Sequence, residues 1–142
     1  MAIPVLISSE VEVEVPFHDI DVMKVAWHGH YVKYMEIART QLTRKFDYDY
    51  PEMEASGFAW PIVGINIKYS RPAMYGRKLR IVADLIEWEL RMRIRYTIYD
   101  AETGNKLTKA ESTQVAVNIN TGEMKLGSPS ILADKLTAAG VN

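Results

Sequence analysis

The sequence predicts an α+β domain in which an antiparallel sheet wraps around one long helix. A helical pattern begins after residue 28. One segment with alternating polarity precedes it in the sequence, and four such segments follow it. A helix with one apolar stripe must bury that stripe, so the strands are expected to form a sheet against it. With 142 residues and 48% apolar side chains, we expect one domain over residues 1–142.

The first strand is expected at Glu10–Val15. Glutamate and valine alternate there, so the three valines share one face and the three glutamates share the other. Pro16 lacks a backbone donor and ends the strand. This pattern is typical of a strand with one face on the core and the other in solvent.

The long helix is expected to begin near His28 or Gly29 and to run to about Phe46, because no Pro or Gly interrupts the chain from His30 to Tyr50. Its apolar residues recur at steps of four, three and four and therefore share one stripe: Tyr31, Met35, Ala38 and Leu42. The opposite stripe is polar and is expected to face solvent: Lys33, Glu36, Thr40 and Arg44.

Behind the helix the sequence period changes to two, which indicates strands. After a helical turn at Glu52–Gly57, strands are expected at Val63–Tyr69, Leu79–Leu85, Met92–Ile98 and Lys106–Asn118. Asp100–Asn105 is expected to be a hairpin turn. The C-terminal helix is expected at Ser128–Leu136, with Ser128 or Ser130 as its cap.

The segment Phe17–Arg39 concentrates the residues that could do chemistry. It holds all three histidines and two aspartates that are two residues apart. No Ser, Thr or Asn caps the helix start, so its first N–H groups are free to hold a ligand oxygen, and the helix dipole favours a developing oxyanion there. Asp21 lies seven residues before His28, close enough to fold back and act as a nucleophile or base.

These residues carry a family resemblance. Asp-x-Asp, a short loop, Val-x-aromatic-His and a Tyr-rich helix with Glu-x-x-Arg resemble the 4-hydroxybenzoyl-CoA thioesterase family of hotdog-fold enzymes, which includes the bacterial Tol–Pal-associated acyl-CoA thioesterases. The run Tyr69–Tyr75 resembles that family's strand-to-turn passage, so the likeness covers most of the chain. It implies the hotdog fold, whereas element order alone also allows other helix-on-sheet folds. It further implies that Asp21 is the catalytic carboxylate and that the backbone N–H of His28 holds the oxyanion. The N–H of Gly29, the next residue, is our additional candidate donor.

The resemblance also implies a substrate and an assembly. We expect hydrolysis of an acyl-CoA, or of an acyl carrier protein thioester, without a cofactor, by a homodimer or dimer of dimers with sites between subunits. Two alternatives stay open: a protein that binds acyl thioesters without hydrolysis, and a hydratase or dehydratase with His28 as base. The family often has small residues after the Asp where this chain has Met23-Lys24, so Met23 is expected to line the pocket.

Each candidate residue also has a plainer interpretation. Asp21 could cap a turn, and Asp19 would share its side in an extended segment and could orient it. His28 could act through its ring, while His18 and His30 are expected to be structural or surface residues. No metal is expected, because side chains two apart at a helix start diverge, unlike the i, i+4 histidine pair of a helical metal site.

Composition excludes several classes of function. The net charge of -1 gives no general attraction to nucleic acid or to a membrane surface, and the absence of cysteine excludes a disulfide framework and a Cys nucleophile. The segment Met1–Ile7 has no basic start and too short an apolar run for a signal peptide or a membrane span, so a cytoplasmic location is expected.

Coenzyme A phosphates would then have to meet local basic residues. Arg71 and Lys78 are our candidates. For each of the other basic residues of the strands, a solvated strand face is the favoured interpretation: Arg77, Arg80, Arg91, Arg93 and Arg95.

Overall fold

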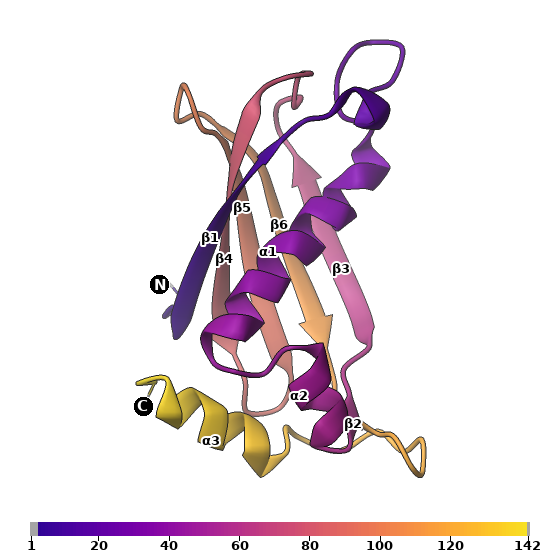
Figure 1. Ribbon diagram of the computed structural model, residues 1–142, viewed down its shortest axis with the longest axis vertical. Coiled ribbons are helices and arrows are strands. Elements are labelled where there is room, and N and C mark those ends of the chain that lie inside the picture. The colour runs from indigo at the N-terminus through magenta and orange to yellow at the C-terminus, as the bar shows by residue number, and fades with distance from the viewer. Residues whose placement is uncertain (1–2, 142) are drawn as a thin grey trace.

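The computed structural model describes residues 3–141 and shows a five-stranded antiparallel sheet with one long helix across one face (Figure 1). The strand order is β1-β4-β5-β6-β3. The strands are β1 Ile7–Glu14, β3 Ile62–Tyr69, β4 Lys78–Glu87, β5 Met92–Asp100 and β6 Lys106–Gln114. The predicted α+β class, an antiparallel sheet around one long helix, is confirmed.

Helix α1, Tyr31–Lys45, follows a 3₁₀ turn at His28–His30. The predicted apolar stripe is buried against the sheet, with each of its four residues 3% exposed or less, and the helix packs on β1 and β4. Neither the 3₁₀ turn nor α1 has a side-chain cap at its start, as expected from the sequence. The helix is thus fixed by packing, and its first N–H groups are left without a capping side chain.

Beyond α1 the chain turns at Asp47, whose φ of 54° lies in the left-handed region. The short helix α2, Tyr50–Ala55, begins two residues earlier than the predicted helical turn, because Asp49 and Glu52 form a capping box around its start. Both features lie at the end of the molecule opposite the start of α1 (Figure 1).

The central strands β4 and β5 supply most of the sheet's buried face. Alternate residues of both strands are fully buried in the core: Leu79, Ile81, Ala83, Leu85, Met92, Ile94, Tyr96 and Ile98. Arg93 and Arg95 of β5 face the other way, as predicted. Arg93 pairs with Glu87 and Glu111, and Arg95 pairs with Asp84, so these arginines hold the outer face together.

The strand expected over Lys106–Asn118 is not continuous. Strand β6 ends at Gln114, where its neighbour β3 begins, so the chain beyond it has no partner in the main sheet. It forms a separate two-stranded ribbon instead, in which β7, Val117–Asn118, pairs with β2, Phe58–Ala59.

The predicted caps of the C-terminal helix are also wrong. Helix α3 spans Ser130–Ala138, and Pro129 occupies its N-cap position with no side-chain bond. The hydroxyl of Ser128 donates to the carbonyl of Trp88 instead. Ser128 lies one residue before the N-cap position, so its hydroxyl joins the loop to Trp88 and does not cap the helix.

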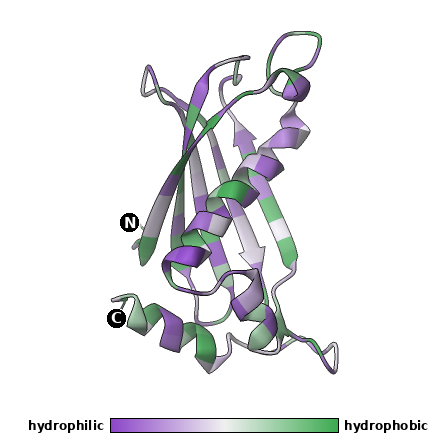
Figure 2. Ribbon diagram, viewed as in Figure 1, coloured by the Kyte–Doolittle hydropathy of each residue, from purple (hydrophilic) through white to green (hydrophobic). Residues whose placement is uncertain are grey.

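Strand β3 forms one edge of the sheet, and its apolar side chains are only partly covered. Ile65 is 42% exposed and Tyr69 is 46% exposed, although both pair in register with buried residues of β6, Ser112 and Thr108, and so lie on the side that faces α1. Val63, at an irregularity in the pairing of β3 with β6, is 58% exposed. Figure 2 shows hydrophobic segments along this edge strand. An exposed apolar edge strand is a surface that proteins normally cover.

Among residues 3–141, no helix combines the length and the apolar character required to cross a bilayer. Met1 and Ala2, the first residues of the segment considered for a leader, lie outside the described residues.

Candidate active site

Asp21 opens a tight loop that folds back on itself. Its N–H donates to the carbonyl of Val25 (3.0 Å), the N–H of Lys24 donates to the carbonyl of Asp21 (3.0 Å), and a bridge between Ile20 and Ala26 closes the loop. Lys24 has a φ of 64°, a conformation that glycine adopts without strain. The backbone therefore keeps the turn expected for small residues, although the side chain is a lysine.

The loop lies against the segment between β3 and β4. The N–H of Ala26 donates to the carbonyl of Ala73 (2.7 Å), and the N–H of Tyr75 donates to the carbonyl of Lys24 (3.1 Å). These backbone bonds join the two segments side by side at the end of the molecule where α1 begins (Figure 1).

A groove of about 310 Å³ opens between these segments and the start of α1. Its lining includes Asp21, His28, Tyr31, Tyr69 and Arg71. The structure therefore brings three sequence-predicted residues, Asp21, His28 and Arg71, to one place.

The Asp21 carboxylate caps its own turn and still faces this groove. One oxygen, Oδ1, accepts a hydrogen bond from the N–H of Met23 (2.8 Å). No other protein group within residues 3–141 donates to this exposed side chain, so Oδ2 remains available. The turn-capping and chemical interpretations of Asp21 are compatible.

The directions of the His28 and Gly29 N–H groups are fixed by hydrogen bonds to the carbonyl of the same peptide unit. In a trans peptide the carbonyl and the N–H point in opposite directions. The carbonyl of Trp27 accepts from the N–H of His30 (2.9 Å), which orients the N–H of His28. The carbonyl of His28 accepts from the N–H of Tyr31 and from Oη of Tyr69 (2.9 Å), which orients the N–H of Gly29. Within the described chain, neither N–H has an acceptor of its own.

Sequence reasoning missed Tyr69. Its ring centroid lies 4.9 Å from that of Tyr31, and burial raises the pKa of both phenols further above neutral pH. Nothing in the alternation of β3 indicates that its last side chain reaches the helix start. Only the antiparallel sheet brings residue 69 to residue 28.

Gly29 leaves room for the indole of Trp27. A Cβ on residue 29 would lie 2.2 Å from Cζ3 of that ring, far inside van der Waals contact. The ring also packs against those of His28 and His30, with centroids 5.0 and 5.5 Å away. Glycine therefore lets the indole lie directly over the helix start.

Asp19 and Asp21 do not share one side, which corrects the expectation of an extended segment. Asp19 ends a 3₁₀ turn, Phe17–Asp19, and its side chain is 1% exposed. Burial by itself raises the pKa of the Asp19 carboxyl, but hydrogen bonds from Lys33 and Tyr34, with the charges of Lys33 and His30, outweigh burial and lower it. Burial, together with the bond to Asp19, raises the pKa of Tyr34.

Three further predicted residues do not line the groove. Gly29 follows His28 in the 3₁₀ turn but is not part of the lining. Met23 is 73% exposed at the tip of the loop, and Lys78 opens β4, paired in register with Glu14 of β1. Neither Lys78 nor Arg71 forms a salt bridge with any described residue.

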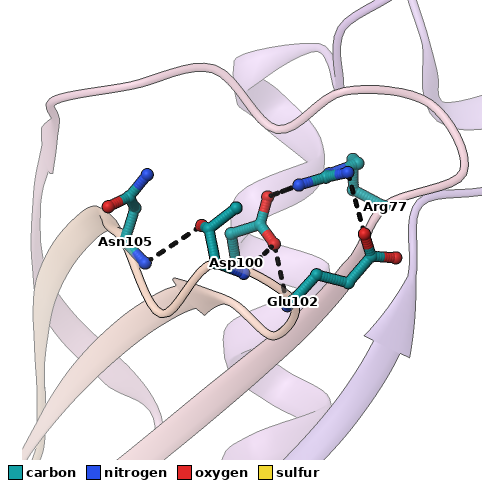
Figure 3. A network of polar contacts seen from close by, with 5 residues as sticks. Arg77, Asp100, Glu102 and Asn105 are labelled. Carbon is teal, nitrogen blue, oxygen red and sulfur yellow. Dashed lines mark hydrogen bonds and ion pairs between the residues drawn. The ribbon is translucent and has the colours of Figure 1, made fainter.

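Arg77, by contrast, is already engaged. It bonds to Asp100 through Nε and Nη2 (2.9 and 2.7 Å) and to Glu102 through Nη1 (2.9 Å), beside the Asp100–Asn105 turn (Figure 3). These bonds raise the pKa of Arg77 and lower that of Asp100. Arg77 thus serves the hairpin turn rather than a ligand.

The histidines form no metal cluster. Within residues 3–141, no group of three or more His, Cys, Asp or Glu side chains is placed to hold an ion. His18 and His30 lie 3.6 and 3.7 Å from Asp19 Oδ1, beside the loop rather than in the groove.

Comparison with known proteins identifies the group. The family model described as the thioesterase-like superfamily matches residues 15–136. The chain belongs to this superfamily. A Bacillus subtilis (strain 168) protein named "Putative acyl-CoA thioesterase YneP" is 31% identical over 111 residues, covering 78% of this chain and 80% of that protein. The predicted enzyme class of this superfamily member, a thioester hydrolase, is confirmed.

Solved structures agree on the fold. A DHNA-CoA thioesterase from Staphylococcus aureus has a TM-score of 0.81 at 23% identity, covering 94% of this chain and 88% of that chain. A mutant 4-hydroxybenzoyl-CoA thioesterase complexed with 4-hydroxybenzoyl-CoA has a TM-score of 0.79 at 17% identity, covering 91% and 98%. Together with the family match, these structures confirm the predicted hotdog fold of the chain.

Proposed function

We propose that this thioester hydrolase is an acyl-CoA thioesterase, which releases a carboxylate and free coenzyme A without a cofactor. The observation that carries the proposal is the groove shared by the exposed Asp21 carboxylate and by His28 at the helix start, where the N–H groups of His28 and of the next residue, Gly29, have no acceptor within residues 3–141. The name of the 31% identical relative is consistent with it. The Asp-x-Asp pattern further suggests the branch that contains the 4-hydroxybenzoyl-CoA and Tol–Pal-associated enzymes.

In the proposed mechanism, the thioester carbonyl lies between Asp21 and the helix start. Asp21 either attacks the carbonyl carbon or takes a proton from an attacking water. The N–H of His28, aided by that of Gly29, donates to the oxyanion as it forms. Because hydrogen bonds on the opposite sides of their peptide units hold these donors, little reorganisation is needed in the transition state.

Arg71 is the proposed contact for coenzyme A phosphates. It lines the groove and has no salt-bridge partner within residues 3–141, so its guanidinium is free to form paired hydrogen bonds with phosphate oxygens. Lys78 is a weaker candidate because it lies outside the groove. Met23 would line an acyl pocket only where a second subunit brings other surfaces to the loop tip. A thioester on acyl carrier protein would meet the same groove.

We further propose a homodimer or a dimer of dimers. The exposed apolar side chains of edge strand β3 support this assembly, because pairing with a second copy would cover them. Tyr69, at the end of that strand, would then lie near the interface and the groove at once. We propose a cytoplasmic location, with which the lack of cysteine is compatible.

A thiol-release assay with a panel of acyl-CoA thioesters tests the function. Asp21→Asn should lower turnover by about 100-fold or more while the circular dichroism spectrum is unchanged. Asp47→Asn is the matched control, since it makes the same change at an exposed aspartate at the other end of α1. Full turnover by Asp21→Asn would remove Asp21 from the mechanism.

The same assay separates the alternatives. Tight binding of an acyl-CoA without thiol release would favour a binding protein. Hydration of an enoyl-CoA without thiol release would favour a hydratase that uses the His28 ring.

A further inference from the structure

The Asp19 carboxylate is buried beside the groove but does not line it. Asp19 accepts hydrogen bonds from Lys33 Nζ on both oxygens (2.6 and 2.5 Å) and from Tyr34 Oη on Oδ2 (2.7 Å). The donors come from the first turn of α1, fourteen and fifteen residues further along the chain. Asp19 thus joins the loop to the helix, and none of the three side chains lines the groove.

The carboxylate of Asp19 offsets an unfavourable interaction of Lys33 with the helix dipole. Lys33 is the third residue of α1, where the positive end of the helix dipole disfavours a cation. A carboxylate at the same end is favoured by the dipole and offsets the lysine. A buried carboxylate also needs its hydrogen bonds, because an unpaired one would lose its hydration without compensation.

The backbone of Asp19 extends the connection to the loop. Its carbonyl accepts from the N–H of Trp27 (2.9 Å), the residue just before the 3₁₀ turn that carries His28. Its own N–H donates to the carbonyl of Pro16 (3.0 Å), two residues beyond the end of β1. One residue therefore holds both ends of the segment that contains Asp21, and also the peptide that precedes the candidate oxyanion donors.

We propose that Asp19, Lys33 and Tyr34 form a clamp that sets the position of the Asp21 loop relative to the start of α1. Asp19 is a positioning residue in this account, since its two oxygens are engaged with the helix and face away from the groove. The catalytic consequence rests on the proposed function. The structural consequence, a loop held by the clamp, does not.

A positioning role and a purely stabilising role of these three side chains predict different effects on kcat. If it only stabilised the fold, its loss would lower stability everywhere and leave the active molecules fully active. If it positions the loop, its loss should lower kcat with little change in KM. Misplacement of a reacting group by about 1 Å is enough to cost on the order of 100-fold.

Tyr34→Phe and Lys33→Met test the clamp while leaving the Asp19 carboxylate in place. The matched control is Tyr48→Phe, which removes a hydroxyl from another fully buried tyrosine, bonded to Ser56 and Trp60 at the far end of the molecule. We expect about a 10- to 100-fold lower kcat in both clamp variants and an unchanged kcat in the control. The pH at which kcat/KM falls should stay the same, because the clamp takes no part in proton transfer.

Amide hydrogen exchange measures the structural part directly. The amides of Asp21 and Trp27, which are bonded within the loop and to Asp19, should exchange at least tenfold faster in the clamp variants, while β5 amides keep their rates. Wild-type exchange at these two amides, or equal acceleration throughout the sheet, would overturn the clamp.

The two proposals fail in different ways. If Asp21→Asn is inactive but both clamp variants keep the wild-type kcat, the clamp has no catalytic role and the proposed function stands. If the clamp variants free the loop amides while Asp21→Asn remains active, the clamp stands and the proposed catalytic role of Asp21 fails. If no acyl-CoA in the panel releases thiol with the wild-type protein while the loop amides respond as expected, the clamp stands and the proposed function fails. A shifted pH profile in Lys33→Met would contradict a purely positioning role.

Discussion

Replacing Tyr69 by Phe should reduce turnover without unfolding the protein. The change removes one hydroxyl, which donates to the carbonyl of His28 over 2.9 Å. The ring stays, and so does its packing 4.9 Å from Tyr31. The carbonyl keeps its second donor, the N–H of Tyr31, so no buried acceptor is left without a partner. What is lost is one of the two bonds that orient the N–H of Gly29.

The magnitude follows from that hydrogen bond. A neutral hydrogen bond contributes about 0.5–1.5 kcal/mol net, and because Tyr69 is 46% exposed we expect the lower half of that range, about 0.5–1 kcal/mol. If the bond serves the transition state, kcat should fall roughly two- to fivefold with KM unchanged. The melting temperature should fall by about 1–4 °C.

Steady-state thiol release and differential scanning calorimetry measure the two effects. Tyr75→Phe is the control, because Tyr75 is exposed beside the same loop and its hydroxyl bonds to no described group. An unchanged kcat in Tyr69→Phe would show that this hydroxyl does not orient the site. A raised KM with unchanged kcat would assign Tyr69 to substrate binding instead.

Three further changes test the local geometry. Gly29→Ala should displace the Trp27 ring and shift tryptophan fluorescence, with a loss of stability below the about 1–3 kcal/mol of an overpacked core because Trp27 is 49% exposed; an unshifted spectrum would contradict the contact. Lys24→Gly should raise stability by about 0.5–1 kcal/mol in urea unfolding by relieving a φ of 64°, and a destabilised variant would refute the strain. The pKa of Asp19 is depressed in the folded protein, so protonation favours the unfolded chain and stability should fall as pH drops from about 5 towards 2. Urea titrations of Asp19→Asn should show a shallower fall, and an identical pH dependence would contradict the assignment.

The long helix and the central strands were predictable because each follows from local periodicity. The stripe of Tyr31, Met35, Ala38 and Leu42 requires one buried face in any fold, and β4 and β5 alternate for the same reason. The single strand predicted over Lys106–Asn118 failed because alternation does not reveal where a neighbouring strand begins. A strand ends where its partner ends, and the partner lies far away in the sequence.

The parts of the candidate site that depend on local sequence were predictable as well. An uncapped helix start and a nearby aspartate are sequence features, and both line the groove. The different roles of Asp19 and Asp21 were not predictable. A 3₁₀ turn sends the first carboxylate into the protein, and the second remains exposed. Lys33 was the one available signal, as a cation at the wrong end of a helix dipole.

The sequence by itself determined which residues are apolar on one face, where the helix lacks a cap and which acidic groups lie near that point, because these properties depend on spacing along the chain. The tertiary structure alone decided that Tyr69 reaches His28, that Asp19 joins Lys33 and Tyr34, and that Arg77 is engaged while Arg71 is free. Those contacts join residues fourteen or more positions apart, and only the packing of the helix on the sheet fixes such distances.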